Sequence, residues 1–175
     1  MNSPVKSVIE SILFISNKPV TLSHLKNVFD KHSNEKILSI IKELQNEYES
    51  SNRGFRIQLV AGGYQMTTNP ANFDHLKKFM TEKRKISLSL ASLECLALIA
   101  YKQPITIPEI NNIRNVDSGA VVKNLLAKSL IKILGKKKTP GKPYIFGTTK
   151  EFLIHFGIDD LKSLPPLEEI EQVLE

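Results

Sequence analysis

PVTL at Pro19–Leu22 and PITI at Pro104–Ile107 are two copies of one motif, 85 positions apart. The same offset, without a gap, pairs apolar residues with apolar residues over most of Leu13–Ile41. Two copies of one small core would keep this match, because the residues that have to agree are those that pack together. The sequence therefore predicts two domains with the same fold, each built around one copy of the motif.

The residues around the first motif predict a helix, a short helix, a longer helix and a β-hairpin, in that order. Apolar residues at helical spacing run through Val5–Leu13, and Thr21 and Ser33 stand where the N-caps of the next two helices are expected. Phe55–Val60 then alternates largely with a period of two, and Ala61–Gly63 can supply a turn into a return strand. A helix-turn-helix followed by such a hairpin is the order of a winged-helix domain.

The second motif has the same surroundings. Apolar spacing predicts a helix over Leu90–Tyr101, and Thr106 with Glu109 forms a capping box at the start of the next helix. Further expected features are an N-cap at Asp117 or Ser118, wing strands at Leu130–Leu134 and Tyr144–Phe146, a capping box at Thr148 and Glu151, and a helix end at Gly157. We therefore expect a mainly α-helical fold with small β-wings, an α+β fold of two tandem winged-helix domains.

The expected domains occupy residues 1–85 and 86–160, and an acidic, flexible tail occupies residues 161–175. A charged linker, Thr81–Lys85, separates the two copies.

No apolar run approaches the ~20 residues of a membrane span, so no membrane association is expected. Cys95 is the only cysteine and is expected to be a buried structural thiol, which fits a reducing cytoplasm. The four histidines lack metal-ligand spacing, so neither a metal nor another cofactor is expected.

The net charge of +6 is unevenly distributed along the chain. Residues 1–149 hold 22 Lys/Arg and 11 Asp/Glu, whereas residues 150–175 hold 2 and 7. A basic body suggests an acidic partner such as nucleic acid, although a solvated basic surface explains it equally well. The longer helix of the first copy, at Asn34–Ser51, carries four glutamates and would repel phosphate. Its counterpart at Ser118–Ser129 carries Lys123 and Lys128 without an acid, and could face DNA or an acidic protein segment.

Several fragments of this chain resemble the segregation and condensation protein B family over nearly its whole length. They are Val60–Gln65, Ile99–Pro104, Pro140–Pro143, Gly147–Thr149, Glu151–Leu153, Phe156–Gly157 and Leu164–Pro165. In this order, on a doubled winged-helix pattern, the fragments are specific to that family. The chain departs from the family pattern at Asn115 and Ser129, where glycine is usual.

The resemblance implies a non-catalytic subunit of a bacterial SMC–kleisin complex that supports chromosome condensation and segregation during cell division. It implies a homodimer formed through the first domain, binding to the kleisin subunit (segregation and condensation protein A), and contact with the SMC ATPase through the kleisin. The expected location is the cytoplasm, at the nucleoid, with DNA contact indirect or weak and non-specific. The alternative is a winged-helix DNA-binding transcriptional regulator. An enzyme with accessory winged-helix domains is a remote third option, because the two copies leave no room for a catalytic domain.

Candidate residues follow from the same interpretation, and none of them is catalytic. The apolar stripe expected at the dimer interface is Phe73, Leu76, Phe79 and Met80. The residues expected to bind the partner are Tyr101, Lys123, Lys128, Lys142 and Tyr144. The two tyrosines could equally complete the core. The candidate phosphate contacts are Lys136, Lys137 and Lys138, in the loop between the second pair of wing strands.

Overall fold

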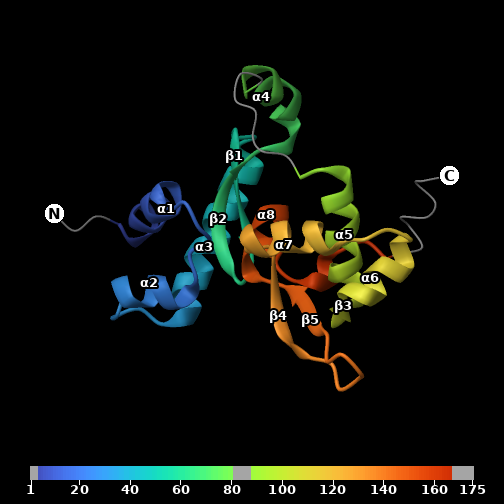
Figure 1. Cartoon of the computed structure of the whole chain (residues 1–175). Coiled ribbons are helices and arrows are strands. Elements are labelled where there is room, and N and C mark those ends of the chain that lie inside the picture. Colours follow the sequence, from blue (N-terminus) through green and yellow to red (C-terminus); the bar gives the residue numbers. More distant parts are fainter. Residues whose placement is uncertain (1–3, 81–87, 167–175) are drawn as a thin grey trace. The chain divides into compact units, whose positions relative to one another are not determined.

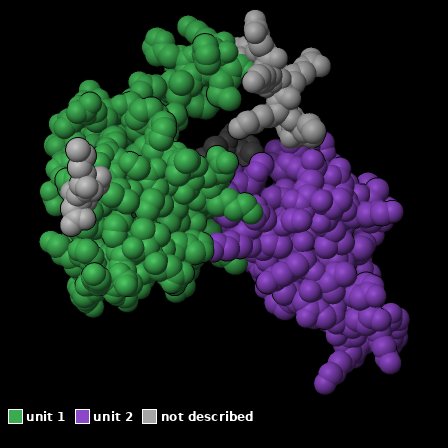
Figure 2. All heavy atoms as spheres, turned by 90° about the vertical axis from the view of Figure 1, so that its left-hand side faces the viewer, with its two compact units in different colours: residues 1–83, 157–175 green, residues 84–156 purple. Residues whose placement is uncertain are grey.

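The computed structural model describes residues 4–80 and 88–166, which form two compact units. The first unit contains residues 4–80 together with 157–166, and the second contains residues 88–156 (Figure 2). Both combine helices with a small antiparallel sheet, so the fold is α+β as predicted. The expected domain ranges 1–85 and 86–160 stay predictions, and the linker Thr81–Lys85 lies outside the described residues.

The first unit follows the predicted order of helix, short helix, longer helix and hairpin (Figure 1). Its elements are α1 (Val5–Ile15), α2 (Leu22–Val28), α3 (Asn34–Ser50), β1 (Phe55–Val60), β2 (Gly63–Thr68), η1 (Pro70–Asn72), α4 (Phe73–Met80) and, after the second unit, η2 (Leu161–Ser163). The predicted N-caps are confirmed: Thr21 Oγ1 accepts a hydrogen bond from His24 N, and Ser33 Oγ accepts one from Lys36 N, both at 3.3 Å. α3 ends at Ser50, one residue before the predicted end at Ser51, and Asn52 then takes a left-handed backbone with φ of 46°.

The apolar faces of the first three helices and of the hairpin close over one core. It consists of Ile9, Leu13, Val20, Leu25, Phe29, Ile37, Ile40, Ile41, Leu44 and Ile57. Most of these residues are those that the helical spacing identified. Their burial holds α1, α2 and α3 against the hairpin, since the removal of apolar surface from water is the main favourable term in folding.

The hairpin of the first unit turns at Ala61 and Gly62, both of which have positive φ. Such a pair of left-handed residues matches the twist of the two strands, which pair from Phe55 with Thr68 to Val60 with Gly63. The segment after the second unit reaches this turn. Ala61 N donates to Ile158 O at 3.1 Å, and Gly62 N donates to the Asp159 carboxylate at 2.7 Å. These two bonds explain why residues 157–166 group with the first unit.

The second unit repeats the order around a three-stranded sheet. Its elements are α5 (Leu90–Lys102), β3 (Ile105–Thr106), α6 (Ile107–Arg114), α7 (Gly119–Ala127), β4 (Ile131–Lys136), β5 (Tyr144–Thr148) and α8 (Lys150–Phe156). The strand order is β3-β5-β4, antiparallel throughout. The predicted capping box at the start of α6 is confirmed, with Thr106 N donating to Glu109 at 2.9 Å and Glu109 N donating to Thr106 Oγ1 at 3.4 Å.

One predicted cap is wrong. Thr148 does not start a capping box with Glu151, because β5 continues to Thr148, which pairs with Ile131 of β4. The cap of α8 is instead Thr149, whose Oγ1 accepts a hydrogen bond from Phe152 N at 3.2 Å. The predicted end of that helix is confirmed, since Gly157 has a left-handed φ of 67° directly after α8.

The structure gives a physical reason for a glycine preference at the two positions where the chain departs from the pattern of the family that it resembles. Asn115 caps α6 with φ of 54°, and Ser129 follows α7 with φ of 58°, so both backbones are left-handed. After α7, Leu130 N donates to Leu125 O at 3.1 Å and Ser129 N donates to Leu126 O at 2.9 Å. This is the Schellman pattern, in which glycine is the favoured residue at the position of Ser129.

We predict that Ser129→Gly stabilises the protein by about 0.5–1 kcal/mol, because it removes the crowding of a Cβ in a left-handed backbone. Asn115→Gly should change stability by less, since Asn tolerates this conformation. The measurement is the free energy of unfolding from urea titration. Ser39→Gly, within α3, is the control and should destabilise by about 0.5 kcal/mol. A loss of stability in Ser129→Gly would contradict the prediction.

Candidate interaction surfaces

Three of the four residues of the apolar stripe of α4, Phe73, Phe79 and Met80, are exposed, and Leu76 is half-buried. Phe73 is 62% exposed, Phe79 is 86% exposed, and α4 contains no buried residue. The Lys77 ammonium lies 6.0 Å from the centre of the Phe73 ring, so Lys77 covers that ring only in part. Figure 1 shows α4 beyond the end of the β1–β2 hairpin, away from α1 and α2. The residues proposed for a dimer interface therefore do not complete the core of their own unit.

A second apolar surface of the first unit was missed from the sequence. A groove of about 540 Å³ lies between α1 and α2 and is lined by Ile12, Ser16, Asn17, Lys18, Pro19, Val20, His24 and Val28. Beside it on α1, Phe14 is 72% exposed and Ile15 is 78% exposed. The sequence does indicate this surface, because α1 carries apolar residues outside the stripe that faces the core.

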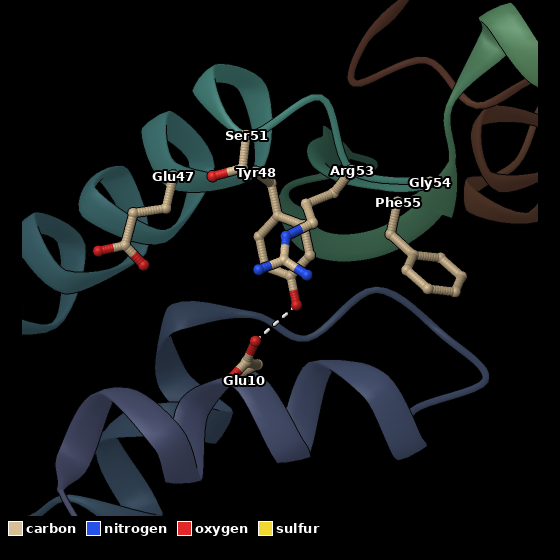
Figure 3. A pocket seen from close by; sticks show the side chains of 7 residues that line it. All are labelled: Glu10, Glu47, Tyr48, Ser51, Arg53, Gly54 and Phe55. Carbon is tan, nitrogen blue, oxygen red and sulfur yellow. Dashed lines mark hydrogen bonds between the residues drawn. The ribbon is translucent and has the colours of Figure 1, made fainter.

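A polar pocket of about 460 Å³ lies between α1 and the end of α3 (Figure 3). It is lined by Glu10, Glu47, Tyr48, Ser51, Arg53, Gly54 and Phe55. Tyr48 points from α3 toward α1, where its hydroxyl donates a 2.5 Å hydrogen bond to the Glu10 carboxylate. This bond, together with partial burial, raises the pKa of Tyr48 to about 12. The bond ties α1 to α3 and is a structural feature of the pocket.

Because the pKa of Tyr48 is raised in the folded state, the Tyr48–Glu10 bond stabilises the protein fully below about pH 10 and loses this effect as the pH rises toward 12. Tyr48→Phe should therefore cost about 1 kcal/mol at pH 8. The difference from the wild type should shrink above pH 10. Thermal unfolding across this pH range measures it, with Tyr64→Phe as the control. A constant difference up to pH 12 would refute this assignment.

The β4–β5 hairpin of the second unit is strongly basic. Between Ile131 and Tyr144 it carries five lysines and no acid, at positions Lys132, Lys136, Lys137, Lys138 and Lys142. All five are exposed. The loop from Lys136 to Lys142 lines a shallow hollow of about 500 Å³. The Lys136 ammonium lies 4.9 Å from the centre of the Tyr144 ring, a cation–π contact at the base of the loop.

The three candidate phosphate contacts are not equivalent. Lys137 donates to the Glu109 carboxylate of the α6 capping box, and the resulting ion pair is partly exposed. This hydrogen bond, with those from the Thr106 side chain and backbone, lowers the pKa of Glu109 to about 2. Lys137 therefore ties the hairpin to α6, whereas Lys136 and Lys138 extend from the hairpin without a carboxylate partner among the described residues.

The residues proposed to bind a partner lie on three elements of the second unit. Lys123 lies on α7 and Lys128 caps its end, Lys142 and Tyr144 lie on the hairpin, and Tyr101 lies on α5. Tyr144 is 49% exposed and stacks under a lysine, so it does not complete the core. Tyr101 is half-buried.

Arg114 holds α7 in place from α6. Its guanidinium donates to Glu94 at 2.8 Å, to Ser118 at 2.8 Å and to the Cys95 thiol at 3.1 Å, linking α5, α6 and the start of α7. Cys95 is fully buried, as expected of a structural thiol. The residues on α7 are thus presented from a rigidly tied helix.

Within residues 4–80 and 88–166, no group of three His, Cys, Asp or Glu could hold a metal ion. None of the described helices has the length and apolar character that a membrane span needs. The features that stand out are surfaces, apolar on the first unit and basic on the second.

Comparison with known proteins gives the family. The family described as "Segregation and condensation complex subunit ScpB" matches residues 7–167. Segregation and condensation protein B of Syntrophotalea carbinolica is 41% identical over 169 residues, covering 97% of this chain and 85% of that protein. The crystal structure of ScpB from Mycobacterium tuberculosis is 27% identical and covers 88% of this chain and 95% of that one, with a TM-score of 0.42. A dimer of a ScpB N-terminal domain complexed with a ScpA peptide is 26% identical and covers 43% and 94%, with a TM-score of 0.41.

Fold and surfaces together define an α+β protein of two similarly built units with exposed apolar and basic surfaces. The matches in sequence are more specific than this class. The chain belongs to the family of segregation and condensation complex subunit ScpB, as its motifs predicted.

Proposed function

We propose that this chain is a non-catalytic subunit of a bacterial SMC–kleisin complex. It dimerises through its first unit and binds the kleisin, segregation and condensation protein A, with its second unit, in support of chromosome condensation and segregation during cell division. The observation that carries the proposal is the family match over residues 7–167, to a family described as a subunit of the segregation and condensation complex. The SMC ATPase is then reached through the kleisin, in the cytoplasm at the nucleoid.

Each unit is proposed to be a winged helix, with α3 and α7 as the second helices of the two helix-turn-helix pairs. The element order and the hairpin after each of these helices support this assignment. Winged-helix units offer grooves beside their helices and, in the second unit, an edge strand at β4. An amphipathic helix or an added strand can bind such surfaces.

The exposed stripe of α4 supports the homodimer. Large apolar side chains that are mostly exposed in their own unit are usual at protein interfaces. The groove between α1 and α2 offers a second apolar surface, which is available to a kleisin segment or to the second copy. We assign the dimer contact to α4, because none of its apolar residues is buried and it lies on a helix beyond the minimal unit.

Phe73→Asp with Phe79→Asp should dissociate the dimer, weakening self-association by at least about 30-fold, since buried aromatic residues are frequent hot spots. Light scattering over a concentration series measures the oligomeric state, and circular dichroism checks that the fold is kept. Val28→Asp, in the groove between α1 and α2, is the control and should leave the dimer intact. If Val28→Asp dissociates the dimer and the α4 variant does not, the interface lies at the groove.

Kleisin binding is proposed to use the basic surface of α7. Lys123→Glu with Lys128→Glu should weaken binding of the purified kleisin subunit by at least ~1 kcal/mol, or about fivefold, if both lie at the interface rim. Titration calorimetry measures this change. Lys102→Glu with Lys150→Glu has the same change in net charge at other exposed positions and should have little effect. Equal weakening by both pairs would argue for a general charge effect and against this interface.

The runner-up is a sequence-specific transcriptional regulator. The lysines of α7 and of the β4–β5 hairpin favour DNA contact. The four glutamates of α3, however, disfavour its insertion into a DNA groove. Tight, sequence-selective DNA binding at physiological salt, without kleisin binding, would favour the regulator.

A further inference from the structure

We propose that the basic wing, defined as Lys132–Lys142 of the second unit, binds the phosphate backbone of duplex DNA without reading its base sequence. This inference goes beyond the proposed function, which concerns protein partners, and it does not need the kleisin. It gives the chain a direct contact with the chromosome in addition to any contact made by the rest of a complex.

The second unit carries an excess of basic residues. The described part of the second unit, residues 88–156, holds ten Lys/Arg and four Asp/Glu, and five of these ten basic residues are lysines of the basic wing. One of the four carboxylates, Glu109, is already paired with Lys137. Duplex DNA carries one negative charge per ~1.7 Å of its axis, so a projecting hairpin with several lysines can release condensed counterions when it binds.

The wing also has a defined shape. Lys137 N donates to Pro143 O and Lys142 N donates to Thr139 O, both at 2.9 Å, so the tip is a closed turn. Its base is fixed by the ion pair of Lys137 with α6 and by the stacking of Lys136 on Tyr144. Lys138 and Lys142 are consequently presented from an ordered tip, which lowers the entropy lost when they contact phosphate.

The residue types favour a duplex and oppose base reading. The wing has no arginine, which is the usual bidentate reader of guanine, and no Asn or Gln for adenine. The nearest aromatic residue, Tyr144, already contacts Lys136, so no free ring is offered for stacking unpaired bases. Lysines on an exposed hairpin suit the phosphate backbone, which positions a protein without specifying sequence.

The first unit provides an internal contrast. Its hairpin has an uncharged turn at Ala61 and Gly62 and carries only Arg56 as a charged residue, and its long helix α3 carries Glu35, Glu43, Glu47 and Glu49. The same architecture therefore has a basic hairpin only in the second unit. The contrast predicts that DNA binding maps to one unit and is lost when the wing alone is changed.

The test is fluorescence anisotropy of the full chain, without kleisin, on two labelled DNA duplexes of unrelated sequence. The wild type should bind both equally at low salt, with an affinity that falls steeply between about 50 mM and 200 mM salt. Lys136→Glu with Lys138→Glu should weaken binding at least about tenfold and lower the salt slope by roughly 2. Lys102→Glu with Lys150→Glu, with the same change in charge, should weaken it by less than about threefold.

Lys138→Gln with Lys142→Gln provides a second variant that spares the contact between Lys136 and Tyr144, and it should weaken binding in the same direction. Equal behaviour of the wing and control variants would overturn the proposal, as would absence of binding by the wild type at low salt. A preference of more than about tenfold for one duplex sequence, or tighter binding of a matched RNA duplex, would also overturn it. Kleisin binding by Lys136→Glu with Lys138→Glu should stay unchanged, which separates failure of this inference from failure of the proposed function.

Discussion

Each unit depends on a short extended segment that pairs with the return strand of its hairpin. In the first unit, Val20 and Tyr64 exchange two backbone hydrogen bonds of 2.8 Å, and in the second, β3 pairs with β5 from Ile105 opposite Phe146. The threonine that follows then caps the next helix in both units. In each unit, the paired extended residue and the threonine after it thus join the hairpin to the helices. Both the core and the direction of the hairpin follow from that connection.

Close packing at the return strand explains other residues of the family motifs. A Cβ on Gly63 would lie 3.0 Å from the Pro19 backbone, so a side chain there would force the extended segment to shift by a few tenths of an ångström. In the second unit the Gln103 amide bridges Ala100 O and Thr148, and a Cβ on Gly147 would lie 2.7 Å from its oxygen. Motif residues that are far apart in the sequence, such as Gln103 and Thr148, therefore contact each other. They determine the architecture and leave the outer surfaces free to differ.

The two units use that freedom differently. The first exposes apolar side chains on α4 and beside α2, which suits contact with protein surfaces. The second places its lysines on α7 and on a hairpin anchored to α6 through Lys137 and Glu109. Both cores use aliphatic residues at matched positions, so the two units differ mainly at their surfaces.

The sequence by itself determined the repeat, the helices and their caps, the hairpins and the family, because these depend on local spacing and on which residue types can cap or turn. It also identified the stripe from Phe73 to Met80 and the lysines from Lys136 to Lys138. Only the tertiary structure decided which of these residues are engaged. Lys137 is paired with Glu109, Tyr144 is stacked under Lys136, and Thr149 takes the cap expected of Thr148. Strand register and long-range contacts set these outcomes, and neither is encoded in the spacing of neighbouring residues.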